Sequence, residues 1–207
     1  MTRVIHRIWL GGDEPAWSRA WAAAWQESHP DWVVHTWDDV AVATLPLRSR
    51  AWYWELPGPV HRADVLRVEL VRRFGGVYVD ADMEPLRPIT AFVPSHGAWC
   101  TPDADGIPGG AFFGGDAFAS VWDRMLDVFA ERWRDTPSLP PNHLFGPFAW
   151  RDLFGADGDG WITVLGTPAT AYPFHWNEPR VLMDDPDERA ARCARSLMIH
   201  RYAGTWT

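Results

Sequence analysis

Lysine is absent from this sequence, and all 19 of its basic residues are arginine. Mechanisms that need a lysine as a Schiff base, a catalytic base or a phosphate-binding ammonium are therefore excluded. Cysteine is scarce, so Cys100 and Cys193 cannot form a disulfide framework and we expect two free thiols. No apolar run approaches the roughly 18 residues of a membrane helix, and the start, MTRVIHRIWL, lacks the features of a signal peptide. These absences predict a protein without a transmembrane segment, and we expect it in the cytoplasm.

The composition is that of an ordinary globular protein, with 47% hydrophobic and 22% charged residues. A length of 207 residues suits one well-packed domain and is short for two, so we expect a single domain over residues 1–207. The formal net charge of −8 counts against a nucleic-acid partner, because such a partner is held largely through its phosphates. Fifteen tryptophans are a large number for this length. We expect most of them to pack in or around the core, but aromatic rings also stack on bases and sugars, so some can line a site.

Strand and helix patterns alternate along the chain. Strands are predicted at residues 4–10, 32–37, 77–80, 97–101, 110–114 and 161–165, with a last strand and loop within 197–207. Helices are predicted at residues 15–27, 59–74, 117–133 and 142–154. This alternation predicts an α/β sheet whose ligands bind at the carboxyl ends of its strands.

The predicted helix over residues 59–74 carries two charges on its apolar side. At about 100° per residue, Asp64 and Arg67 fall within the arc of apolar side chains, whereas Glu69 falls on the opposite, polar side. Charges on a core-facing side are costly unless they are paired or bound to something. The pair is either a structural ion pair that fastens the helix to the sheet or part of a binding site.

Two carboxylates, Asp80 and Asp82, follow an apolar run in the stretch GGVYVDADMEPL. If the strand continues through them, alternation places both side chains on one side, where they would repel each other. A divalent cation removes this repulsion, and oxygen ligands suit Mg²⁺ or Mn²⁺ bound to a phosphate or diphosphate. A short acidic pair can also cap a turn, which is the structural alternative.

The context of this pair resembles a known family. Residues 63–86, ADVLRVELVRRFGGVYVDADMEPL, resemble the DxD-containing sugar-binding region of glycosyltransferase family 32, and are similar to the catalytic core of the large clostridial glucosylating toxins. The likeness extends to VIHRIWLGG near the start, to FGPFAW and AYPFHW, and to MIHRYAGTW at the end. The resemblance thus spans most of the 207 residues.

The resemblance implies a GT-A fold, which is Rossmann-like with a mostly parallel central sheet flanked by helices. It also implies metal-dependent transfer of a sugar from a UDP- or GDP-sugar donor, with retention of configuration, to a hydroxyl of a saccharide or glycolipid acceptor. The implied cofactor is Mn²⁺ or Mg²⁺.

The resemblance assigns a role to each matching residue. It implies that Asp82 binds the metal directly, that Asp80 contacts the ribose or a metal-bound water, and that His200 contacts the metal or diphosphate. It implies that Asp64 and Arg67 hold hydroxyls of the donor, and that Arg67 acts with Asp80 and Asp82 in catalysis. It also assigns two tryptophans to the donor. Trp9 is implied to stack on the base, and Trp206 is implied to close over the diphosphate.

One departure from the family is plain. Where the family has an asparagine beside the donor, this chain has PGGAFFGG, in which Gly109, Gly110 and Ala111 offer no amide side chain.

Two other functions compete with glycosyl transfer. An aspartyl-phosphate hydrolase places its acidic pair near the chain start and needs a lysine, which this chain lacks. A non-catalytic carbohydrate- or nucleotide-binding module explains the tryptophans but not a metal site.

Overall fold

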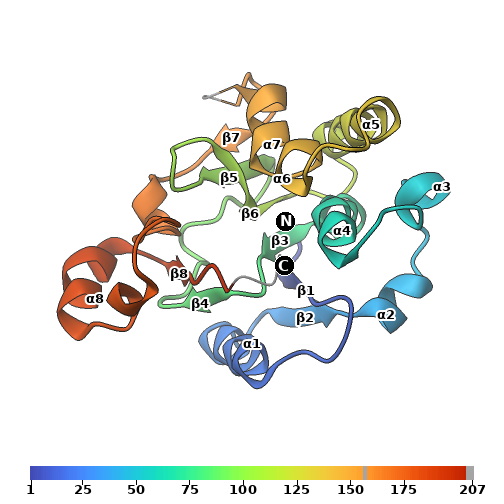
Figure 1. Ribbon diagram of the computed structural model, residues 1–207. Coiled ribbons are helices and arrows are strands. Elements are labelled where there is room, and N and C mark those ends of the chain that lie inside the picture. Colours follow the sequence, from blue (N-terminus) through green and yellow to red (C-terminus); the bar gives the residue numbers. More distant parts are fainter. Residues whose placement is uncertain (156–157, 204–207) are drawn as a thin grey trace.

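The computed structural model describes residues 1–155 and 158–203, and its regular elements alternate as the sequence predicts (Figure 1). The strands are β1 (Val4–Ile8), β2 (Val33–Trp37), β3 (Gly76–Val79), β4 (Met83–Pro85), β5 (Ala98–Pro102), β6 (Pro108–Gly115), β7 (Thr163–Val164) and β8 (Met198–His200). The α-helices are α1 (Ala16–Ser28), α2 (Asp39–Ala43), α3 (Arg50–Tyr53), α4 (Pro59–Phe74), α5 (Ser120–Asp135), α6 (Pro141–Leu144), α7 (Pro147–Phe154) and α8 (Pro186–Arg192). Short 3₁₀ turns lie at Pro168–Thr170, Arg180–Met183 and Cys193–Arg195.

The central sheet has the strand order β2-β1-β3-β6-β5-β7. Strand β1 pairs in parallel with β2 and β3, whereas β6 runs antiparallel to both of its neighbours, β3 and β5. Because β7 is parallel to β5, β6 is the one reversed strand of the six. The predicted fold class, an α/β fold with a mostly parallel sheet, is confirmed.

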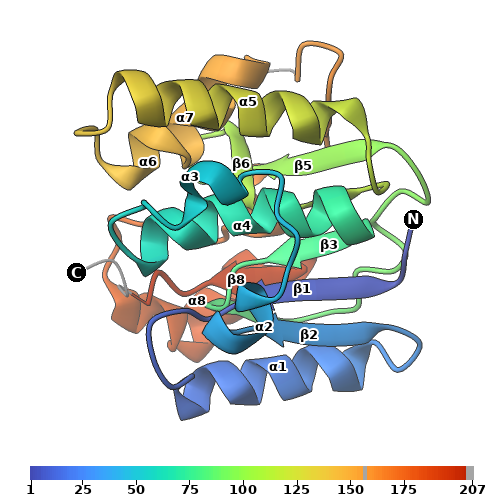
Figure 2. The same ribbon diagram turned by 90° about the vertical axis from the view of Figure 1, so that its right-hand side faces the viewer.

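The two faces of the sheet are covered differently. Helices α4 and α5 lie side by side on one face (Figure 2), and the small antiparallel sheet of β4 and β8, with α8, lies on the other (Figure 1). Alternation along β3 divides its side chains between the two hydrophobic clusters, with Tyr78 on the α4 side and Val77 and Val79 on the other. The end of β3 therefore emerges between the two layers.

Helix α4 begins and ends where the sequence predicts. Pro59 occupies its first turn, and the chain leaves at Gly75, whose φ of 65° is accessible chiefly to glycine. The prediction of a polar side was wrong for Glu69, which is buried and accepts a hydrogen bond of 2.6 Å from the backbone N–H of Ser49. The loop that carries α3 covers this side of the helix, so the middle of α4 is enclosed all round.

Several other boundaries differ from expectation, and the two largest differences are at the end of β3 and in the helix predicted over residues 142–154. Strand β3 ends at Val79, so Asp80 lies in a turn. The helix predicted over residues 142–154 is two helices, α6 and α7, separated at Gly146. A Cβ at Gly146 would lie only 2.7 Å from the Cα of Asn142, so the chain turns tightly there before Pro147 starts the next helix.

Strand β1 contains a buried histidine that is neutral for a geometric reason. Trp37 Nε1–H donates to His6 Nδ1 at 3.1 Å, and His6 Nε2 lies 2.9 Å from the carbonyl oxygen of Gly75. Only the tautomer with its proton on Nε2 satisfies both contacts, because a second proton on Nδ1 would face a donor. Burial lowers the pKa of His6 to about 4, against the raising effect of the hydrogen bond to Gly75.

Both cysteines, Cys100 and Cys193, are free thiols, as predicted, and both are buried. Within residues 1–155 and 158–203, every helix is too short or too polar to cross a bilayer.

Candidate functional site

The acidic pair lies in the tight turn that leads from β3 to β4. Backbone hydrogen bonds hold this turn at both ends, from Asp80 N to the carbonyl of Ala111 at 2.9 Å and from Met83 N to the carbonyl of Asp80 at 3.0 Å. Strand β4 then pairs with β8 in a register that sets Met83 opposite His200. The turn and the β4–β8 pair together bring His200 to the carboxylates, although 117 residues of sequence separate it from Asp82.

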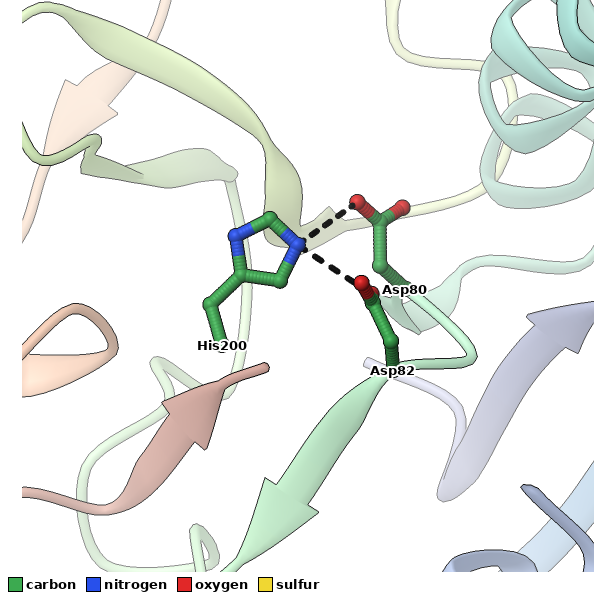
Figure 3. A group of neighbouring side chains, drawn as sticks. All are labelled: Asp80, Asp82 and His200. Carbon is green, nitrogen blue, oxygen red and sulfur yellow. Dashed lines mark ion pairs between the residues drawn. The ribbon is translucent and has the colours of Figure 1, made fainter. Parts of the chain in front are cut away.

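Asp80, Asp82 and His200 point toward one another (Figure 3). His200 Nε2 lies 3.1 Å from Asp82 Oδ1 and 3.8 Å from Asp80 Oδ2, and one ligand atom from each residue fits within 4.8 Å of the others. Their side chains are 12–13% exposed. The expectation that these three residues meet is confirmed, although β4 rather than an extended β3 brings them together.

Hydrogen bonds hold each carboxylate in a different environment. Tyr78 Oη–H donates to Asp80 Oδ1 at 2.7 Å, whereas the backbone N–H of Ala203 donates to Asp82 Oδ2 at 2.9 Å. Burial raises the pKa of Asp80 against the pull of Arg67. For Asp82 burial acts the same way, but the neighbouring His200 outweighs it and holds the pKa of Asp82 below its usual value.

By their chemistry, the three residues suit a divalent cation. Among the described residues, the buried Nδ1 of His200 makes no hydrogen bond, whereas Nε2 faces both carboxylates. Buried polar atoms without partners are rare in folded proteins, and two carboxylates with one imidazole are a ligand set that metals accept. The residues present therefore fit a divalent metal.

Helix α4 adds a buried ion pair to this site. Arg67 contacts the carboxylate of Asp64 one turn away and also lies 3.6 Å from Asp80 Oδ1. Both members of the pair are at most 6% exposed, which confirms that they lie on the buried side of α4. Burial raises the pKa of Asp64 to about 6 even though Arg67 favours its charged form. The pair is thus continuous with the acidic turn.

A cavity of about 100 Å³ opens beside the turn. Its lining includes Trp9, Trp17, Tyr78 and both acidic residues of the turn. The rings of Trp9 and Trp17 meet edge to face with centroids 5.6 Å apart. Trp9, which the resemblance assigns to the base, lines this cavity together with the carboxylates, whereas Trp17 and Tyr78 were not predicted. Trp17 was detectable only as one of several tryptophans on the first helix.

The position of the missing asparagine is filled by another side chain. A Cβ built on Gly110 would lie 2.8 Å from Trp150 Nε1 and 3.1 Å from Arg67 Cζ, so a side chain does not fit there without a shift. Trp150 is on α7, in the FGPFAW segment, and its Nε1 is buried without a hydrogen-bond partner among the described residues. Trp206 lies outside the described residues.

The part of the chain that includes the acidic turn is similar to a family of glycosyltransferases. Residues 17–99 match the family described as "Glycosyltransferase sugar-binding region containing DXD motif". This region of the chain thus resembles DXD-containing glycosyltransferases, and the resemblance predicted from the sequence is confirmed.

Curated relatives agree with this assignment. The chain is 26% identical over 176 residues to inositol phosphoceramide mannosyltransferase 3 of Schizosaccharomyces pombe, a match that covers 77% of this chain and 48% of the relative. It is 26% identical over 104 residues to mannosyl phosphorylinositol ceramide synthase CSH1 of Saccharomyces cerevisiae, covering 44% of this chain and 27% of that protein. The chain thus spans about half the length of the first relative and about a quarter of the length of the second.

Two solved structures share the fold. PaToxG glycosyltransferase superposes with a TM-score of 0.62 at 14% identity, covering 73% of this chain and 67% of that one. The ligand-free glycosyltransferase domain of the YGT toxin superposes with a TM-score of 0.51 at 10% identity, covering 80% of each chain.

Proposed function

We propose that this protein is a metal-dependent, retaining glycosyltransferase that moves a sugar from a UDP- or GDP-sugar to a hydroxyl group. The observation that carries the proposal is the convergence of Asp80, Asp82 and His200 beside an aromatic-lined cavity. A phosphate-binding cation on one side and aromatic rings on the other match the two ends of a nucleoside diphosphate. The DXD-region match supplies the reaction class.

Asp82, Asp80 and His200 would hold the cation. A divalent cation held there would neutralise negative charge on the departing diphosphate. The imidazole among the ligands favours Mn²⁺ over Mg²⁺, because Mg²⁺ prefers oxygen ligands alone. Mn²⁺ is therefore the proposed ion, with Mg²⁺ as a weaker substitute.

The remaining residues have roles that follow from their positions. Trp9, at the cavity wall, would stack on the base. Arg67 lies beside Asp80 and would place positive charge near the leaving diphosphate, while Asp64 would orient Arg67 and accept hydrogen bonds from donor hydroxyls. Trp206 is proposed, from the resemblance alone, to close over the diphosphate. We assign no protein nucleophile, so retention would arise from attack by the acceptor hydroxyl on the face from which the diphosphate departs.

The acceptor is proposed to be a saccharide or a glycolipid. Both curated relatives have names that refer to mannosyl or inositol phosphoceramide chemistry, so a GDP-mannose donor and an inositol-containing glycolipid are the first pair to test. Residues 1–207 as one domain, and a location in the cytoplasm, stay predictions from the sequence.

The test is a panel of nucleotide sugars (UDP-glucose, UDP-galactose, UDP-N-acetylglucosamine and GDP-mannose), each incubated with protein and Mn²⁺. We expect release of UDP or GDP from at least one donor, and we expect EDTA to abolish this release. Binding of UDP or GDP without turnover of any donor, even with acceptors added, would instead favour a non-catalytic binding module.

A further inference from the structure

Arg7, in strand β1, is a charged residue whose side chain is fully buried. Among the described residues its one carboxylate partner is Glu14, 3.3 Å from Nη1, and its Nε makes no hydrogen bond. Burying a guanidinium is costly, and replacing a buried ion pair by apolar side chains is often neutral or stabilising. Stability of the core alone therefore gives little reason for an arginine at this position.

The contacts of Arg7 supply a reason. Its Nη2 donates to the carbonyl oxygen of Ala81 at 2.8 Å, to the carbonyl oxygen of Ser18 at 3.0 Å and to Ser18 Oγ at 2.8 Å. Its Nη1 donates to Thr36 Oγ1 at 3.1 Å as well as to Glu14. One planar group thus joins β1 to β2, to helix α1 and to the acidic turn, and the guanidinium fork fixes all of these directions at once.

The contact with Ala81 acts on the acidic pair directly. Ala81 lies between Asp80 and Asp82, and its carbonyl belongs to the same rigid peptide plane as the backbone nitrogen of Asp82. On the other side, the backbone N–H of Arg201 donates to the carbonyl of Asp82 at 3.0 Å. The backbone at Asp82 is therefore held from β1 and from the segment after β8, and loss of the Arg7 contact would remove one of these two supports.

The contact with Ser18 reaches the aromatic wall of the cavity. Ser18 is in the first turn of α1, next to Trp17, whose ring packs against Trp9. Both tryptophans line the same cavity as Asp82. The side chain of Arg7 therefore makes hydrogen bonds to two parts of the site. One part is the turn that carries the carboxylates, and the other is the helix that carries Trp17.

We propose that Arg7 is a positioning residue, which holds the Asp80–Asp82 turn and the Trp17 end of α1 in a fixed relation, so that a divalent cation and a nucleotide base are bound together. This inference rests on the proposed function, because it takes the turn as the metal site and the cavity as the base site. Supporting groups of this kind around metal ligands typically contribute 10–100-fold to metal affinity.

The test is Arg7→Lys, which keeps the charge but replaces the fork by a single ammonium. Binding of Mn²⁺ is measured by the electron paramagnetic resonance of free Mn²⁺, alone and with saturating UDP or GDP, and folding is checked by urea unfolding. We expect the Mn²⁺ dissociation constant of folded Arg7→Lys to rise about 10–100-fold, and the factor by which Mn²⁺ tightens nucleotide binding to fall. The matched control is Arg72→Lys, since Arg72 pairs with Asp123 at 2.6 Å on the α4–α5 side, and it should leave both quantities unchanged.

If Arg7→Lys does not fold, Ser18→Ala decides, because it removes one contact with α1 and leaves the bond from Arg7 to Ala81. It should reduce the coupling between Mn²⁺ and nucleotide severalfold. Wild-type Mn²⁺ affinity and coupling in folded Arg7→Lys, or unchanged coupling in Ser18→Ala, would overturn the role of Arg7 while the proposed function stands. A wild-type protein that binds neither Mn²⁺ nor nucleotide would overturn both.

Discussion

Replacing Asp64 by asparagine separates a role in folding from a role in ligand binding. Arg67 would keep Asp80 as a neighbour at 3.6 Å, so it would not become a buried charge without compensation. Burial raises the pKa of Asp64 to about 6 from an ordinary 3.8, which corresponds to a cost of about 3 kcal/mol for the ionised group at pH 7. We therefore expect Asp64→Asn to leave the free energy of unfolding unchanged or slightly higher.

Ligand binding should respond in the opposite way. A nucleotide sugar at 100 times its dissociation constant stabilises the folded protein by about 2.7 kcal/mol, which raises the melting temperature of a chain of this size by about 5–11 °C. We expect wild-type protein with Mn²⁺ and donor to show this rise and Asp64→Asn to lose most of it. Differential scanning calorimetry with and without donor measures both quantities in one series.

The control is Asp123→Asn, because Asp123 on α5 pairs with Arg72 on α4, away from the acidic turn, and this variant should keep the full rise. A loss of roughly 3–5 kcal/mol in Asp64→Asn, the range for breaking a buried ion pair, with an undiminished donor-dependent rise, would refute the reasoning. The pair would then be a structural link between α4 and the turn.

Three further predictions follow from single contacts. Asp82→Asn should keep the bond from Ala203 and the fold but lose at least 100-fold in turnover, and normal turnover with saturating Mn²⁺ would remove Asp82 from the metal site. In the folded protein the pKa of His6 is lowered to about 4, so the unfolded chain takes up this proton at a higher pH than the folded chain does. The contribution of His6 should therefore lower the free energy of unfolding by about 3 kcal/mol as pH falls from 6.5 to 4. The difference in urea-unfolding free energy between wild type and His6→Asn checks this, and a difference that does not vary with pH would contradict it. Gly110→Ala should move Trp150, lower the melting temperature and weaken donor binding, and a wild-type melting temperature and donor affinity would show that the space at Gly110 is not restricted.

Much of the scaffold could be predicted because local signals agree with the packing. Helix α4 has the predicted bounds, Pro59–Phe74, because proline and paired glycines mark its ends. Asp64 and Arg67 could be placed on its buried side because helical periodicity fixes which residues share a face. The acidic pair was found because two carboxylates after a strand have few structural reasons to be there.

What the sequence left undetermined depends on contacts between distant segments. Where β3 ends is decided by the bond from Asp80 N to Ala111 and by the pairing of β4 with β8, and neither is local. Glu69 is buried because the preceding loop returns to it. The space at Gly110 is filled by a tryptophan from α7, 40 residues further on, and no periodicity relates the two positions.

The central claim is that Asp80, Asp82 and His200 bind a cation that in turn binds a nucleoside diphosphate. Isothermal titration calorimetry of UDP and GDP into the protein, with Mn²⁺ and then with EDTA, tests it most directly. We predict that at least one nucleotide binds in the presence of Mn²⁺, that EDTA weakens this binding at least tenfold, and that Asp82→Asn removes the metal dependence. Binding of neither nucleotide in Mn²⁺, or equal affinity with Mn²⁺ and with EDTA, would contradict the claim.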